Sequence, residues 1–446
     1  MAGEWRQCTI GDLCDAGAAE LQTGPFGSQL HAHDYVDEGV AVVPTEAIRD
    51  RRIDHSVLPK ISATKAKELI RHRLRPGDIL FARRGVQATG HVGCVREAED
   101  GFICGTGAIR LRVNEHHNDI SADFVSHVLA DPASVDWFKF HAIGATMPNL
   151  NEGIIRSFAF ALPPLPEQRA IAHILGTLDD KIEVNRRMNE TLEAMTRALF
   201  KSWFVDFDPV RAKAEGRDPG LPKPLADLFP DSFEDLELGE IPGGWRVGNV
   251  GEFATLSRDG INPGDSPDET FDHFSIPAFD EGRSPKSELG STIKSNKFFV
   301  PPDAVLLSKL NPRIPRIWLP VVRDNYRAIC STEFLVTLPR IGISREFLYS
   351  FLSNAAFVDV FETLVTGTSG SHQRVKPEGL LAMDVVIPVE PVIHQFAKVM
   401  RPLLVRVDRA RDESTALAAL RDSLLPKLIS GEIRIKDATH MVRKAT

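Results

Sequence analysis

The longest periodic segment of the sequence is PEQRAIAHILGTLDDKIEVNRRMNETLEAMTRALFKSWF, which runs from Pro166 to Phe204. Apolar and small side chains recur in it at alternating steps of four and three residues, which is the a/d pattern of a coiled-coil seam. At ~1.5 Å per residue such a helix is about 55 Å long, too long and too one-sided for the core helix of a small domain. We predict a seam of Leu175, Leu178, Ile182, Asn185, Asn189, Leu192 and Leu199.

A second seam follows the same steps near the C-terminus and includes Leu403, Val407, Leu417 and Leu424. A seam sustained at a 3.5-residue period favours a partner helix. We therefore predict that the two helices pair as an antiparallel coiled coil, with a globular head at each end of a rigid rod. The alternative is two separate amphipathic helices, each packed on its own half of the chain. Pro426 is expected to kink the second helix near its end.

The chain is a tandem duplication, because landmarks recur in the same order in its two halves. Trp5 recurs as Trp245, and Cys104 recurs as Cys330. PGDILFAR from Pro76 corresponds to PDAVLLSK from Pro302, and ADFVSHVL to REFLYSFL. Each copy contains short apolar runs typical of strands, a helix, a polar loop bounded by glycine, a Pro-rich hinge and a long helix. In the second copy one apolar helical face spans Phe347 to Phe361, with Ser344 as a plausible N-cap.

The predicted fold class is α+β, a duplicated α/β domain plus long helix, with the two helices paired as an antiparallel coiled coil. The residues 206–240 carry 10 acidic and 4 basic residues and five prolines, which indicates a connector lying on the surface rather than a folded domain. We expect these boundaries: α/β domains at 1–162 and 241–388, helices at 163–205 and 389–436, the connector at 206–240 and a tail at 437–446.

Composition excludes several classes of protein. The 446 residues are 43% hydrophobic and 26% charged, with a net charge of −8, as in ordinary globular proteins with more than one core. No apolar run approaches the ~20 residues of a membrane span, and the start lacks a signal-peptide core. Five cysteines without a CxxC pair argue against a disulfide scaffold. We expect a cytoplasmic protein that does not bind membranes.

Motifs of catalysis are missing from the sequence. It has no GxxxxGK[ST] loop, no GxGxxG motif after a strand and no HExxH, GxSxG or zinc-deaminase pattern. The histidines at 31, 33, 116 and 117 have no cysteine or carboxylate partners at metal-ligand spacing, so surface histidines are the better interpretation. We expect a chain without catalytic residues, metal site or cofactor of its own.

Two basic zones lie at corresponding places in the copies and indicate contacts with DNA phosphates. Residues 47–96 contain 12 basic and 4 acidic residues, and residues 282–327 contain 9 and 3. Arginine, glutamine and asparagine also match the edges of guanine and adenine; the alternative is a solvated charged face. The candidates that follow the two matching strands are Arg83, Arg84, Gln87, Lys309, Asn311, Arg313 and Arg316.

Loops bounded by glycine supply further candidates, although plain turns would look the same. TGPFGSQL, from Thr23 to Leu30, is a tight loop that could approach a nucleic-acid backbone closely. The loops before the two hinges correspond roughly to each other. From these segments we select Thr23, Ser28, Gln29, Asn149, Asn151, His372, Gln373 and Arg374.

The segments PPLPEQRAIAHILGTLDDKIEVNRRMNETLEAMTRALFKSWFVDFDPV and LAALRDSLLPKLISGEI resemble the conserved helices of the specificity subunits of type I restriction-modification systems. The resemblance covers nearly the whole chain, and the recognition domains share GPFGS-like and PGDIL-like pieces. It implies a non-catalytic subunit that recognises double-stranded DNA in DNA methylation and host defence. It also implies two methyltransferase subunits and the motor-nuclease subunits as partners, with S-adenosylmethionine, Mg and ATP bound by those partners.

From the duplication we expect the two diverged heads to read two different half-sites of a split, asymmetric DNA sequence, with the rod setting the gap. Two other functions stay open. The chain could be the recognition half of a fused enzyme with residual nuclease activity, or a helical adaptor that does not bind DNA.

Overall fold

The computed structural model describes residues 5–114, 119–144, 146–236, 239–323, 325–366 and 373–445. They form two compact units, one of residues 1–183 with 415–446 and the other of residues 184–414. In the described residues no helix combines the length and the apolar run needed to cross a bilayer.

The first unit contains a head built on a four-stranded sheet of order β2-β11-β8-β9. These strands are β2 (Ala19–Thr23), β11 (Ala108–Val113), β8 (Ile79–Ala82) and β9 (Val92–Cys94). A second sheet contains β10 (Ile103–Cys104), β4 (Val40–Val43), β7 (Lys60–Ile61) and β3 (Tyr35–Val36), and two strand pairs are β1 (Arg6–Thr9) with β12 (Ala159–Leu162) and β5 (Ile48–Arg49) with β6 (Arg52–Ile53). The helices of this head are α1 (Ile10–Asp15), α2 (Ala63–Glu68), α3 (Ala122–Ala130), α4 (Pro132–His141) and α5 (Glu152–Arg156).

The second unit repeats this plan. Its four-stranded sheet has the order β16-β24-β21-β22, with β16 (Ala254–Ser257), β24 (Phe334–Pro339), β21 (Val305–Ser308) and β22 (Ile317–Trp318). Its other strands are β17 (Gly260–Ile261), β20 (Lys297–Phe299), β23 (Arg327–Ser331), β18 (Thr270–Phe274) and β19 (Lys286–Leu289) in one sheet, and the pairs β15 (Arg246–Asn249) with β27 (Asp384–Ile387), β25 (Val365–Thr366) with β26 (Arg374–Val375), and β13 (Phe233–Leu236) with β14 (Gly239–Pro242). Its helices are α7 (Asp208–Ala214), α8 (Lys223–Ala226), α9 (Val250–Phe253), α10 (Ile276–Asp280), α11 (Arg345–Leu352), α12 (Ala355–Thr363) and α13 (Pro377–Leu381).

The repeat extends to strand register. In the first unit Arg6 of β1 lies opposite Leu162 of β12, and in the second Arg246 of β15 lies opposite Ile387 of β27. Cys104 and Cys330 each lie on a strand that pairs in parallel with another, and burial raises the pKa of both thiols to about 12. These correspondences confirm that the chain consists of two diverged copies of one fold.

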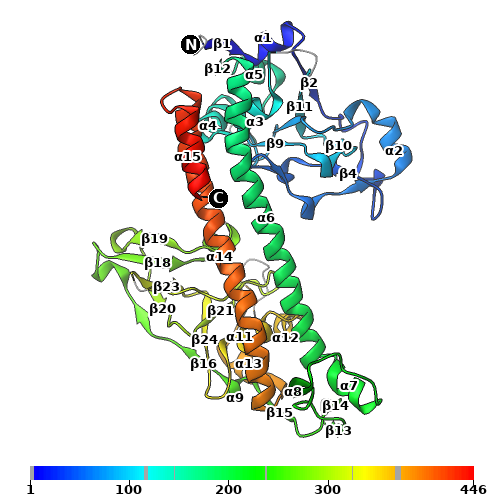
Figure 1. The fold of residues 1–446 in the computed structure, drawn as a ribbon, viewed down its shortest axis with the longest axis vertical. Helices are drawn as coiled ribbons and strands as arrows, with labels where there is room; N and C mark the ends of the chain where they lie inside the picture. Colours follow the sequence, from blue (N-terminus) through cyan, green and yellow to red (C-terminus); the bar gives the residue numbers. More distant parts are fainter. Residues whose placement is uncertain are drawn as a thin grey trace. The chain divides into compact units, whose positions relative to one another are not determined.

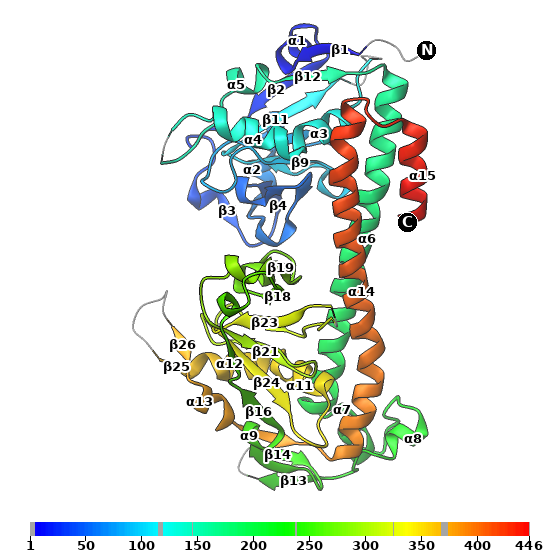
Figure 2. The same cartoon turned by 90° about the vertical axis from the view of Figure 1, so that its left-hand side faces the viewer.

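Two long helices, α6 (Leu165–Phe204) and α14 (Glu390–Ile429), pack side by side within each unit, as Figures 1 and 2 show. In the first unit the start of α6 buries Leu175 and Leu178 with Leu417 and Leu424, from the end of α14. In the second unit the end of α6 meets the start of α14 through the buried residues Phe200, Trp203, Phe396, Met400 and Leu404. The pairing is therefore antiparallel and confirms the predicted fold class.

Each long helix also packs against a head. The two alternatives, helices paired with each other and helices packed on their own heads, therefore occur together. Ile171 and Ile174 of α6 share the core of the first head. Phe200 of α6 and Phe347 of α11 belong to one aromatic cluster of the second unit. Phe347 thus joins the second head to the helix pair.

The helices differ from the sequence-based expectations at three places. The apolar face expected from Phe347 to Phe361 is split between α11 and α12, because the Asn354 side chain accepts from the Ala356 N–H and caps a new helix. The second long helix, expected to reach residue 436, ends at Ile429, followed by Gly431 with a φ of 74°. The expected tail instead forms a further helix, α15 (Ile435–Ala445), which buries Ala438 and Val442 in the first unit.

The acidic connector also packs more closely than expected. Its residues Phe207, Val210 and Phe229 are buried with Trp203 at the end of α6. The connector therefore forms part of the core of the second unit.

Candidate nucleic-acid interface

In the first head, most of the selected side chains meet at one edge of the four-stranded sheet. Both β2 and β8 run antiparallel to β11, so β2 and β8 end where β11 begins. Thr23 lies opposite Ile109, and Ala82 lies opposite Ala108. The loops that follow β2 and β8 therefore emerge beside the loop that precedes β11.

Arg83 is the centre of this edge. Its backbone N–H donates to the Gly107 carbonyl at 2.9 Å, and its own carbonyl accepts from the Leu150 N–H at 2.8 Å. Its side-chain Nε donates to Oδ1 of Asn149 at 3.0 Å. The structure thus brings together Arg83 and Asn149, which lie 66 residues apart in the sequence.

The neighbouring candidates differ in exposure and partners. Arg84 is exposed and makes one long contact, from Nη2 to the Thr106 hydroxyl at 3.4 Å. Gln87 and Ser28 are also exposed. Gln29 is exposed as well, but its Oε1 accepts from the Phe26 N–H at 3.0 Å and shapes its own loop. Arg84 and Gln87 are consequently the side chains best placed to meet a ligand at this edge.

Two candidates of the first head have structural roles. The Asn151 side chain accepts from the Ile154 N–H at 2.8 Å and caps α5. The Thr23 hydroxyl donates to Glu152 at 2.8 Å, which connects the end of β2 to the same helix. Both contacts hold α5 at the edge of the sheet.

The second head forms the same edge with different side chains. The Lys309 N–H donates to the Glu333 carbonyl at 3.0 Å, and the Lys309 carbonyl accepts from the Val375 N–H at 3.0 Å. These are the bonds that Arg83 makes in the first head. Arg374 lies where Asn149 lies in the first head, since Leu310 bridges to Arg374 as Arg84 bridges to Asn149.

Arg374 has a carboxylate partner that Asn149 lacks. Its Nε and Nη2 donate to the two carboxylate oxygens of Glu333, both at 2.9 Å. This bidentate pairing with Arg374 holds the pKa of Glu333 below its usual value, against the opposing effect of burial. The two edges therefore share backbone geometry and differ in charge.

The other candidates of the second head differ in their burial and in their partners. Asn311 has a left-handed φ of 49°, and its N–H donates to the Gln373 carbonyl at 3.0 Å. Arg313 is exposed and contacts Glu362 at 2.9 Å. Arg316 is only 9% exposed and donates to both carboxylate oxygens of Asp280, at 2.7 and 2.9 Å. Its guanidinium group is thus occupied within the domain. His372 lies outside the described residues.

Exposed apolar side chains accompany the polar ones in the loops of the first head. Phe26 is 66% exposed and Val86 is 75% exposed. Ile143 and Met147 are 63% and 61% exposed in the loop before α5. This loop is tied to the loop of Val86, because the Thr89 hydroxyl contacts the Pro148 carbonyl at 3.0 Å.

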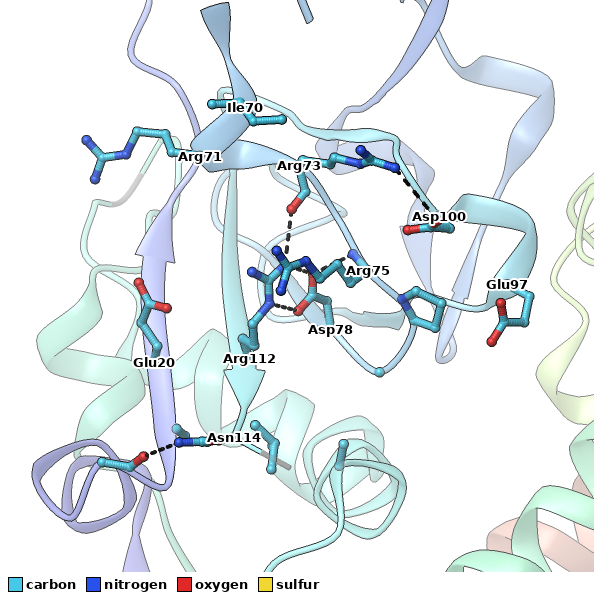
Figure 3. Close-up of a pocket in the computed structure, with 16 residues that line it drawn as sticks. Glu20, Ile70, Arg71, Arg73, Arg75, Asp78, Glu97, Asp100, Arg112 and Asn114 are labelled. Atoms are coloured by element: carbon cyan, nitrogen blue, oxygen red, sulfur yellow. Dashed lines mark hydrogen bonds and ion pairs between the residues drawn. The ribbon is translucent and has the colours of Figure 1, made fainter. Parts of the chain in front are cut away.

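A hollow at the opposite edge of the first sheet contains other arginines of the basic zone. It has a volume of about 1160 Å³ and is lined by residues that include Arg71, Arg73, Arg75 and Arg112. Figure 3 shows Arg73 directed towards Asp100 and Arg112 paired with Asp78, whose nearest atoms are 3.8 and 2.6 Å apart. Part of the basic zone therefore lies away from the edge that carries Arg83.

Three residues that complete the two edges, Thr106, Glu152 and Glu333, are not among the candidates predicted from the sequence. Thr106 lies between Gly105 and Gly107, and this pair of glycines could have indicated a close backbone approach. The loop that contains Gly105 does touch the loop after β2, since a side chain at Gly24 would come within 1.9 Å of the Gly105 carbonyl oxygen. Glu152 and Glu333 carry no comparable local signal.

The histidines that the structure describes show no arrangement for a metal ion. The rings of His31 and His33 stack, with centroids 5.2 Å apart. His116 and His117 lie outside the described residues. Within the described parts of the chain, no group of three or more histidine, cysteine or acidic side chains could hold a metal.

Comparisons with known proteins agree on one family. The model of a family described as type I restriction modification DNA specificity domain matches residues 3–194. The HindI specificity subunit of Haemophilus influenzae is 24% identical over 413 residues, covering 81% of this chain and 87% of that protein. The MjaIX specificity subunit of Methanocaldococcus jannaschii is 22% identical, covering 71% of this chain and 70% of that protein. The crystal structure of a type I restriction-modification S subunit from M. genitalium matches with a TM-score of 0.58 and 14% identity, over 95% of this chain and 96% of that one.

Proposed function

This chain belongs to the type I restriction-modification specificity subunits, and on that premise we propose that its two sheet edges each read one half of a split DNA sequence. The first recognition domain is assigned to residues 1–162 and the second to residues 241–388. The observation that carries the proposal is the repeated edge, with Arg83 bound to the loop before α5 and Lys309 bound in the same way before α13.

The two half-sites are expected to differ, because the same backbone positions carry different side chains. The first edge presents Arg83 with Asn149, which offers amide and guanidinium groups. The second presents Lys309 near an Arg374–Glu333 ion pair. Side chains of different hydrogen-bonding pattern select different bases in the major groove. A palindromic site would instead require two identical readers.

Phosphate and base contacts are divided among exposed and half-buried residues of the two edges. Arg84, Lys309 and Arg313 suit phosphates, and Gln87, Asn149 and Gln373 suit base edges. Phe26, Val86, Ile143 and Met147 are exposed enough to pack against bases or thymine methyl groups. We do not include Asn151 and Arg316 among the DNA contacts, since a helix cap and a buried ion pair occupy them.

The chemistry belongs to other subunits in this proposal. Two methyltransferase subunits would dock on the helix pair and supply S-adenosylmethionine, and motor-nuclease subunits would join them with ATP and Mg. The specificity chain would hold its two recognition domains at a set separation along α6 and α14, which would determine the gap between half-sites.

The test is to co-express the chain with its methyltransferase subunit and to map modified adenines across the host genome. The proposal predicts one motif of two unlike half-sites separated by a gap of constant length. A contiguous or palindromic motif would contradict it. If the chain together with its partner subunits shows no salt-dependent binding to DNA, the alternative of a helical adaptor is favoured instead.

A further inference from the structure

Each head is joined to the helix pair by an arginine whose backbone has an unusual conformation. Arg51 of the first head has a φ of 58°, and Arg283 of the second has a φ of 57°. This left-handed region favours glycine and is costly for an arginine. An arginine kept in such a conformation at two places points to a use for its side chain.

Arg51 lies in the tight turn between β5 and β6, next to Asp50, which has a φ of 48°. Two successive residues with positive φ are typical of a type I′ hairpin turn, in which glycine is the preferred second residue. Arg51 is only 8% exposed. Its Nε donates to the Ser126 hydroxyl at 3.1 Å, and its Nη1 pairs with the Asp179 carboxylate of α6.

Asp179 has a second arginine partner. It is 3% exposed, and its other oxygen accepts from Nη1 of Arg421, on α14, at 2.8 Å. One buried carboxylate of α6 therefore connects the head to both long helices. His127 lies beside this group, and burial together with the charges of Arg51 and Arg421 holds the pKa of His127 well below its usual value. His127 therefore adds no third positive charge beside Asp179 at neutral pH.

The second head uses the same chemistry. Nη1 of Arg283 donates to Oε1 of Glu193, on α6, at 3.2 Å, and Arg411 of α14 pairs with the same carboxylate oxygen. Arg283 also lies over the ring of Phe279, with 4.8 Å between its guanidinium carbon and the ring centroid. Again one acidic residue of α6 is shared by an arginine from a head and an arginine from α14.

The two groups are not copies of each other under the duplication. Asp179 and Glu193 both belong to α6, although the heads belong to different copies. A shift of 225 residues, which superposes the starts of α6 and α14, would place the counterpart of Asp179 at Leu404. The same arrangement therefore arose at two unrelated positions, which favours a shared role over common descent.

We propose that these two groups, Arg51–Asp179–Arg421 and Arg283–Glu193–Arg411, are positioning triads that set the orientation of each recognition domain on the helix pair, and so restrict the gap between half-sites that the protein accepts. This inference rests on the proposed function. The triads act through the heads and touch no DNA. Additional pairs support the first triad, since Arg52 contacts Glu183 at 3.6 Å and Arg96 contacts Asp180 at 3.9 Å.

The turn at Arg51 offers a matched pair of variants. Arg51→Gly places the preferred residue in the turn and removes the side chain, while Asp179 keeps Arg421 as its partner. Asp50→Gly makes the same kind of change at the adjacent residue, whose side chain is 68% exposed and takes no part in the triad. In the second head Arg283→Gly is compared with Lys286→Ala, which removes an exposed pair with Glu281.

The first experiment uses the complex with its methyltransferase and duplexes in which both half-sites are kept and the gap is lengthened or shortened by one base pair. The wild type, Asp50→Gly and Lys286→Ala are expected to prefer the natural gap by about tenfold or more, a difference of about 1.4 kcal/mol. Arg51→Gly and Arg283→Gly are expected to reduce this preference to about threefold or less, with unchanged preference for the bases of each half-site. An unchanged gap preference in both variants would overturn the proposal, as would a loss of half-site preference.

A second measurement needs no DNA and separates failure of the triads from failure of the proposed function. Spin labels are placed at Lys67→Cys in the head and His173→Cys on α6, both exposed, with Cys14 replaced by serine because the other four cysteines are buried. Arg51→Gly should broaden the distance distribution between the labels, and Asp50→Gly should not. Equal distributions in the two variants would refute the positioning role, whatever motif the genome map shows.

Discussion

The side-chain amide of Asn185, on α6, donates a hydrogen bond to a carboxylate oxygen of Glu413, on α14, over 2.8 Å. Asn185 is 1% exposed and occupies a position of the predicted apolar seam. Polar side chains at seam positions define the axial register of paired helices at some cost in stability. This contact therefore aligns the two helices at one place along their length.

A double-mutant cycle on Asn185→Ala and Glu413→Ala should give a coupling free energy of about 1.5–3 kcal/mol, the usual net value of a hydrogen bond to a charged group. The measurement is the free energy of unfolding by urea. The exposed pair of Arg186 and Glu190 on α6 is the control and should couple by about 0.5 kcal/mol or less. A coupling for Asn185 no larger than that of the control would remove the register argument.

Arg84→Ala should weaken DNA binding by the complex and reduce the slope of log affinity against log salt by about 0.9, the value for one phosphate contact. The readout is equilibrium binding to a duplex that carries the mapped motif, between about 50 and 200 mM salt. Arg71→Ala is the matched control, because Arg71 lines the hollow at the opposite edge of the sheet. An equal loss of slope in both variants would show that the edge near Arg83 has no special part in binding.

Asn151→Ala should lower the free energy of unfolding by about 1 kcal/mol, since it removes the cap of α5. Asn151→Asp should largely preserve stability, because a carboxylate caps a helix equally well. Thermal unfolding and the methylation map together test this assignment. If Asn151→Asp changed the bases of the motif, the side chain would be a reader as well as a cap.

Burial raises the pKa of Asp408 to about 6, against the opposing charges of Arg411 and Arg345. The folded state therefore binds the proton of Asp408 more tightly than the unfolded state does, and this residue contributes more stability as the pH falls from above 6 towards 4. Asp408→Asn should match the wild type near pH 4.5 and unfold about 2–4 °C higher at pH 8. A constant difference in unfolding temperature across this range would contradict the raised pKa.

The long-range pattern of the fold could be predicted from the sequence, because heptad seams and repeated landmarks are visible over dozens of residues. Leu175, Leu417 and Leu424 lie buried in the helix pair. The break at Asn354 could not be seen, because the apolar spacing continues across it. The helix α15 was missed because its apolar residues are few, and its burial depends on a surface formed by distant segments.

The candidate site was predictable in part. Arg83 and Asn149 were selected from separate segments, and the structure places them in contact. Arg316 was selected by the same reasoning, but Asp280 occupies its guanidinium group. That partner lies 36 residues away, and nothing local to Arg316 reveals it. Sequence patterns identify the type of side chain, whereas only the folded chain shows which ones are already engaged.

Both sheet edges are held in place by backbone hydrogen bonds. The Arg83 N–H donates to Gly107 and the Leu150 N–H donates to Arg83, while the Lys309 N–H donates to Glu333 and the Val375 N–H donates to Lys309. Such bonds do not depend on which side chains the residues carry. New combinations of side chains can therefore arise on an unaltered scaffold, and one half of the target sequence can change while the other half is preserved. Proteins with this architecture can therefore acquire new sequence preferences by local substitutions that leave the fold unchanged.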